Sequence, residues 1–174
     1  MAGTKVFQIT GYQNSGKTTV MEKLITTCKN HGLTVGTIKH HGHGGCPERI
    51  SIEKDTEKHR LAGADITAVE GSGVLQMEAR KDSWELEEII QLYKGFSPDI
   101  ILVEGYKHHA YPKAVLLRDE NDSGLLAELN HIEAIIGKQP LNLDTNAPFF
   151  LLDDLGPFLS WFMEPLLHKE KDRN

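Results

Sequence analysis

The sequence has little cysteine, few arginines and no excess of positive charge. Its two cysteines, Cys28 and Cys46, are too few for a disulfide framework, which fits the reducing cytoplasm. The 19 basic and 25 acidic side chains give a net charge of −6, which favours neither a nucleic-acid backbone nor an anionic membrane as partner. No apolar run approaches the length of a membrane span, and no hydrophobic signal region precedes the first predicted strand. We therefore expect a soluble, cytoplasmic protein.

The length of 174 residues suffices for one domain that buries most of its apolar surface. No internal repeat or low-complexity linker interrupts the chain. We predict a single nucleotide-binding domain over residues 1–167 and a charged, flexible tail over residues 168–174.

The first motif that carries chemistry follows the apolar, strand-like residues 6–10. It reads Gly11-Tyr12-Gln13-Asn14-Ser15-Gly16-Lys17-Thr18-Thr19, and apolar residues then recur at helical spacing. A strand, a G-x-x-x-x-G-K-T loop and a helix form a phosphate-binding P-loop, in which backbone N–H groups and the positive end of the helix dipole face one anion. We expect Lys17 to reach the β- and γ-phosphates and the Thr18 hydroxyl to hold Mg²⁺.

A second landmark is the apolar run at residues 100–103, which predicts a strand buried on both faces and ends at Glu104. This has the form of a Walker B strand, whose carboxylate acts on Mg²⁺ directly or through water. Because Glu is longer than the commoner Asp, an outer-sphere or water-orienting role is also open, and a surface Glu at a strand end is the alternative. We predict that Lys17 and Glu104 act together in catalysis.

The remaining pattern predicts an α/β fold of the P-loop NTPase type, with a mostly parallel sheet flanked by helices and a β-hairpin insertion. The hairpin consists of two strands joined by Gly71-Ser72-Gly73. The expected elements are strands at 33–39, 65–70, 74–79, 113–118 and 132–137, and helices at 55–63, from Ser83 to near Gly95, and at 155–166.

A loop rich in Gly and His follows the strand at 33–39, at the edge where open α/β sheets bind their ligands. His40, His41, His43 and Cys46 could hold a transition metal, but clustered histidines on a loop are more often solvated or phosphate-facing, and no matching Cys or His pair completes the site. We expect Lys39 and His40 to face the phosphates or a partner's substrate. A second loop carries His108 and His109, whose role the sequence leaves open.

Two further segments have a structural and a functional interpretation. Asp55 either caps the helix at 55–63 or binds Mg²⁺, and Arg60 one turn later could meet an anion. Asn142 and Asp144 could read a guanine edge, but N-K-x-D is missing and turn formation is the better explanation, so the motifs do not separate GTP from ATP.

Together these residues resemble the MobB-type adaptor proteins of molybdenum cofactor biosynthesis. The resemblance spans nearly the whole chain and rests on four segments: the P-loop, Thr37-Ile38-Lys39-His40, residues 54–64, and Ile101-Leu102-Val103-Glu104-Gly105-Tyr106-Lys107. It implies a GTP-binding, weakly hydrolysing homodimer. Such an adaptor assists the nucleotidyltransferase that attaches GMP to molybdopterin, and molybdopterin itself is a further candidate ligand.

The resemblance also implies residue roles. Gly11 through Thr18 would bind phosphate, and Thr18, Asp55 and Glu104 would contact Mg²⁺ or its waters. The segment from Gly44 to Ile50 departs from the family pattern and leaves the roles of His41, His43 and Cys46 open.

Two other functions share the P-loop. A small-molecule kinase needs clustered positive charge over the transferring phosphoryl group, and the chain has only five scattered arginines. A metallochaperone-type GTPase would use the two histidine-bearing loops to carry nickel or zinc. No Gln or Arg is recognisable as a water-orienting or charge-neutralising residue, so we expect slow hydrolysis unless a partner supplies one.

Overall fold

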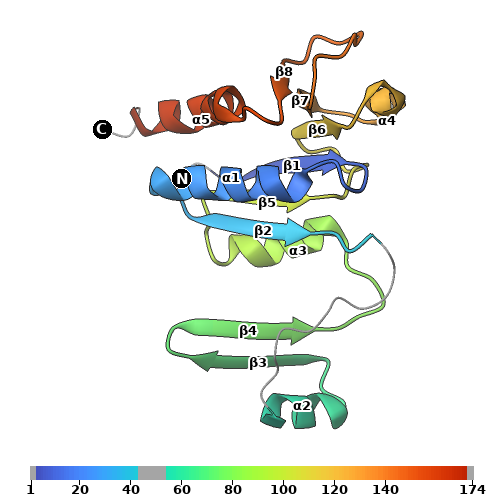
Figure 1. The fold of residues 1–174 in the computed structure, drawn as a ribbon. Coiled ribbons are helices and arrows are strands. Elements are labelled where there is room, and N and C mark those ends of the chain that lie inside the picture. The colour runs from blue at the N-terminus through green and yellow to red at the C-terminus, as the bar shows by residue number, and fades with distance from the viewer. Residues whose placement is uncertain (1–2, 43–53, 172–174) are drawn as a thin grey trace. The chain divides into compact units, whose positions relative to one another are not determined.

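The computed structural model describes residues 3–42 and 54–171, so His43 and Cys46 lie outside the described residues. The chain divides into two compact units (Figure 1). One contains residues 1–42 and 89–174, and the other contains residues 43–88.

The larger unit is built on a six-stranded sheet in the order β2-β5-β1-β6-β7-β8, in which every neighbouring pair is parallel. All residues of β5 and β6 are buried, as expected for a parallel sheet covered on both faces. The strands are β1 (Lys5–Gly11), β2 (Val35–Lys39), β5 (Ile100–Glu104), β6 (Lys113–Leu117), β7 (Ile132–Gly137) and β8 (Phe149–Leu151).

Helices α1 (Lys17–Asn30) and α5 (Gly156–Lys171) cover one face of this sheet. Residues of α1 at helical spacing, including Val20, Leu24 and Cys28, are fully buried against it. The other face packs on α3 (Leu86–Lys94) and α4 (Gly124–Glu128), which follows the short 3₁₀ turn η1 (Glu120–Ser123).

The smaller unit contains α2 (Lys54–Leu61) and an antiparallel hairpin of β3 (Ile66–Gly71) and β4 (Val74–Ala79). Gly71 pairs with Val74, which leaves Ser72 and Gly73 as the two turn residues. Both have positive φ, 52° and 79°, as a type I′ hairpin turn requires.

The structure confirms the predicted fold class: a parallel sheet flanked by helices, with a β-hairpin insertion. Sequence reasoning missed η1, α4 and β8, because elements of three to five residues are too short to show a period. The helix predicted at 155–166 is longer in the structure: α5 contains Pro165 and ends at Lys171, inside the segment predicted as a tail. Within residues 3–42 and 54–171, no helix is both long and apolar enough to span a bilayer.

Candidate functional site

The loop between β1 and α1 is held in a tight curl by unusual backbone angles. Asn14 has φ 60° and Gly16 has φ 95°, both in the left-handed region. A side chain at Gly11 would place its Cβ 2.6 Å from the Leu116 carbonyl oxygen, so only glycine fits there. In the described structure no side chain caps the first turn of α1, which leaves its N–H groups available to a ligand.

A buried hydroxyl beside this loop supports a polar ligand. The Ser15 side chain is buried, and its Oγ makes no hydrogen bond to any described residue. The Thr10 Oγ1, at the end of β1, is likewise buried without a described partner. Buried hydroxyls normally have a partner, so these atoms fit a site completed by a bound anion or water.

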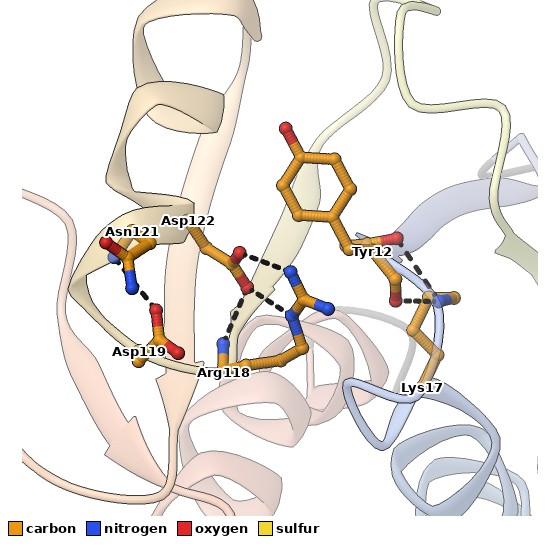
Figure 2. Close-up of polar contacts among 7 residues, drawn as sticks. Tyr12, Lys17, Arg118, Asp119, Asn121 and Asp122 are labelled. Carbon is orange, nitrogen blue, oxygen red and sulfur yellow. Dashed lines mark hydrogen bonds and ion pairs between the residues drawn. The ribbon is translucent and has the colours of Figure 1, made fainter.

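Lys17, the first residue of α1, folds back over the loop. Its Nζ donates hydrogen bonds to the carbonyl oxygens of Gly11, at 3.2 Å, and Tyr12, at 2.6 Å (Figure 2). Burial lowers the pKa of Lys17, and the nearby Glu104 carboxylate partly opposes that shift. Lys39 and Arg118 lower its pKa further, so the charged groups around Lys17 include both signs.

Glu104 lies at the same edge of the sheet as Lys17. It pairs in register with Ile9 of β1 and with Lys39 of β2, so all three strands bring their carboxyl ends together. The Lys39 Nζ lies 3.3 Å from the Glu104 Oε1, and Glu104 is only 9% exposed. The fold thus brings together Lys17, Lys39 and Glu104, which the sequence placed in one site from three distant segments.

The loop after β5 carries aromatic rings next to this edge. The Tyr106 ring lies 4.5 Å from the His40 ring and 5.2 Å from the His109 ring, measured between centroids. Gly105 has φ 90°, and a Cβ there would lie 3.0 Å from the His40 Cβ. His40 therefore packs against the loop after β5. It directly follows Lys39, at the edge of the sheet where Glu104 lies.

Two buried polar side chains, those of Gln8 and Lys113, donate hydrogen bonds to backbone carbonyls of the loop after β5. The Gln8 amide donates to the carbonyls of Gly105, at 3.2 Å, and Tyr106, at 2.9 Å. The Lys113 ammonium, fully buried on the neighbouring strand, donates to the carbonyls of His109, at 2.7 Å, and Asn130, at 2.6 Å. The sequence analysis did not assign these roles to Gln8 and Lys113. A Gln and a Lys within apolar strands indicate buried polar groups that need hydrogen-bond partners.

A third missed residue is Arg118, directly after β6. Its Nε and Nη2 donate to the two carboxylate oxygens of Asp122, at 2.8 and 2.7 Å, and its guanidinium carbon lies 5.2 Å from the centre of the Tyr12 ring (Figure 2). Asp119 accepts a hydrogen bond from the Asn121 backbone and so caps η1, the turn that carries Asp122. A basic residue directly after a buried strand was the signal in the sequence.

The other predicted site residues lie either at the start of α1 or on α2. Gln13, Thr18 and Thr19 are exposed in the loop and first turn of α1. Asp55 and Arg60 lie on α2 of the smaller unit, where Asp55 accepts from Lys58 and Arg60 pairs with Glu57. Their contacts with a nucleotide stay predictions. Within the described ranges, no group of three or more His, Cys, Asp or Glu side chains is placed to hold a metal ion.

Comparison with known proteins decides the family. The model of the family described as molybdopterin guanine dinucleotide synthesis protein B, MobB, matches residues 6–138. The chain belongs to the MobB family. This match includes the phosphate loop, Glu104 and Arg118, and it ends before β8.

Curated MobB relatives cover most of the chain. A Bacillus subtilis protein named probable molybdopterin-guanine dinucleotide biosynthesis adapter protein is 42% identical over 150 residues, 86% of each chain. The Escherichia coli adapter protein is 30% identical over 153 residues, 83% of this chain and 86% of its own.

Solved MobB structures share the fold. A MobB homologue from Bacillus stearothermophilus superposes with a TM-score of 0.78 at 37% identity, over 94% of this chain and 98% of that one. The predicted family is therefore confirmed in both sequence and fold.

Proposed function

We propose that this MobB-family protein is an accessory protein in the formation of molybdopterin guanine dinucleotide and that it binds GTP with Mg²⁺ at its phosphate loop. Curated relatives that bear the adapter name, at 42% and 30% identity, support the pathway. The observation that carries the nucleotide site is the convergence of Lys17 and Glu104 at one edge of the sheet. The transfer of GMP to molybdopterin belongs to a partner nucleotidyltransferase, and molybdopterin is a further candidate ligand.

Each side chain has a physical role in this proposal. Residues 11–19 bind the phosphates through backbone N–H groups, and Lys17 exchanges its contacts with the Gly11 and Tyr12 carbonyls for phosphate oxygens. Thr18 and Glu104 would hold Mg²⁺, which would neutralise charge on the phosphates when bound. Lys39 and His40 would supply further positive charge or hydrogen bonds to the anion.

Nucleotide choice is tested by titration calorimetry with GTP and ATP in the presence of Mg²⁺. We expect GTP to bind at least ~10-fold more tightly than ATP, a difference of about 1.4 kcal/mol. The Lys17→Ala variant should lose ~100-fold in GTP affinity without a fall in Tm, and Lys29→Ala, at the opposite end of α1, serves as the matched control. Equal affinity for GTP and ATP contradicts the choice of GTP, and unchanged affinity in Lys17→Ala contradicts the site.

The accessory role is tested by reconstitution with a purified molybdopterin nucleotidyltransferase, molybdopterin and GTP. We expect the wild-type protein to raise the rate of dinucleotide formation by the transferase and to form none by itself. Lys17→Ala should fail to raise that rate. Dinucleotide formation without the transferase, or full stimulation by Lys17→Ala, contradicts the proposal.

We also propose that the protein is a cytoplasmic homodimer. Large apolar side chains of the hairpin support this, because Ile66, Val74 and Met77 are 65%, 58% and 51% exposed in the single chain. Light scattering on the purified protein should give twice the chain mass of 19.4 kDa. A concentration-independent monomer is the contrary result.

A further inference from the structure

Arg118 is held in place more firmly than an ordinary surface arginine. Its side chain is 47% exposed, whereas its partner Asp122 is only 2% exposed. Asp122 also accepts a hydrogen bond from the Arg118 backbone N–H, at 2.9 Å, so one buried carboxylate fixes both the main chain and the guanidinium. Such a two-point pair gives the guanidinium a defined orientation before any ligand arrives.

The guanidinium retains donors for a ligand. Nε and one N–H of Nη2 are used by Asp122, and the other three N–H groups make no hydrogen bond to any residue within the described ranges. The group lies over the ring of Tyr12, inside the phosphate loop, and the Lys107 ammonium lies 5.2 Å from the same ring. Figure 2 shows the guanidinium between the Asp122 carboxylate and the Tyr12 side chain.

The strand order places Arg118 and Glu104 on different sides of the phosphate loop's strand. β5, which carries Glu104, and β6, which precedes Arg118, lie on opposite sides of β1. Gly11 pairs with Leu116, so Arg118 lies two residues beyond that pairing, at the edge of the sheet where the phosphate loop begins. In the proposed function the γ-phosphate and Mg²⁺ lie on the Glu104 side, so the nucleoside end of the phosphate chain lies on the Arg118 side.

We infer that Arg118 is a nucleotide-binding residue that contacts the phosphate next to the nucleoside, and that Asp122 is its positioning residue. Three free N–H donors beside a phosphate-binding loop match the oxygens of a phosphate better than they match a base or a carbonyl. This inference rests on the proposed nucleotide site and adds a contact that GTP and GDP share. It places Arg118 away from the bond that hydrolysis breaks.

The test compares GTP and GDP affinities of the full chain by titration calorimetry. In Arg118→Gln we expect Kd to rise ~10-fold for both nucleotides by the same factor, with a weaker dependence of Kd on salt. Lys29→Gln removes the same charge at the far end of α1 and should bind as the wild type does. Unchanged Kd values, or a loss confined to GTP, would each overturn the inference.

Two further variants keep the test decisive if Arg118→Gln does not fold. Arg118→Lys keeps the positive charge but removes the planar set of N–H donors of the guanidinium. Both Kd values should therefore rise ~3-fold, while their salt dependence stays as in the wild type. Asp122→Asn should raise both Kd values as well as lower Tm. A lower Tm with wild-type Kd values means that Asp122 is structural only and overturns its positioning role.

The two proposals fail separately in this experiment. If the wild-type protein binds neither GTP nor GDP, the nucleotide site itself is wrong. If the wild type binds both and Arg118→Gln binds them equally well, only the role of Arg118 is wrong.

Discussion

Replacing Gly11 by alanine tests how tightly the phosphate loop is packed. Gly11 has φ 150°, and its new Cβ would lie 2.6 Å from the Leu116 carbonyl oxygen and 2.9 Å from the Ser15 Oγ. The backbone strain costs about 1–3 kcal/mol and the overpacking about another 1–3 kcal/mol. Because the Leu116 oxygen is part of the backbone of β6, a rotamer change cannot relieve the closer contact. We expect Gly11→Ala to lower the free energy of unfolding by about 2–6 kcal/mol.

Two other glycines separate the two costs. Gly32→Ala tests backbone strain alone, because Gly32 has φ 76° and no atom lies near the position of a new Cβ. It should lower the free energy of unfolding by about 1 kcal/mol. Gly124, with φ −55° at the start of α4 and no atom near its Cβ position, has neither cost, and Gly124→Ala should be neutral or stabilising by up to about 1 kcal/mol.

Urea denaturation followed by circular dichroism gives the unfolding free energy of each variant. The predicted order of destabilisation is Gly11→Ala, then Gly32→Ala, then Gly124→Ala. If Gly11→Ala is no less stable than Gly32→Ala, the close packing of the loop against β6 is wrong.

Three further predictions concern buried groups and turnover. Burial raises the pKa of the Cys28 thiol from 9.0 to about 11. The folded state therefore keeps a proton that the unfolded state loses, and stability should fall by about 2.7 kcal/mol in total as pH rises from well below 9 to well above 11. Cys28→Ala should lose this component of the pH dependence, and an identical profile in the variant would refute it. Lys113→Met leaves the His109 and Asn130 carbonyls without their donor and should cost about 2–4 kcal/mol in urea denaturation, whereas Lys138→Met, an exposed control, should cost less than about 0.5 kcal/mol. GTP hydrolysis by the protein alone should proceed at ~10⁻³ per second in a phosphate-release assay, because the sequence shows no Gln or Arg recognisable as a water-orienting or charge-neutralising residue, and turnover near ~1 per second would contradict that interpretation.

The sequence predicted the main elements and the shared edge of the site for a topological reason. Lys17 and Glu104 follow two apolar strands of a parallel sheet, and the carboxyl ends of parallel strands lie at one edge. The side chains that complete the edge depend on contacts between segments that are distant or irregular. Gln8 and Lys113 are explained only by the loop carbonyls that they hold.

Arg118 shows where local patterns are insufficient. Its orientation depends on Asp122, which lies in a four-residue 3₁₀ turn that has no hydrophobic period of its own. The sequence shows that five arginines are scattered along the chain, but it does not show that one of them is anchored beside the phosphate loop. β8 is missed for a related reason, because three residues are too few to distinguish a strand from a loop.

The most direct test of the nucleotide site is the Mg²⁺ dependence of GTP affinity in the wild type and in Glu104→Gln. Glutamine keeps the size of the buried side chain beside Lys39 but removes the charge that Mg²⁺ requires. We predict that Mg²⁺ tightens GTP binding to the wild type by at least ~10-fold and to Glu104→Gln by less than ~3-fold. An equal Mg²⁺ effect in both proteins would contradict the claim that Glu104 and the phosphate loop share one metal ion.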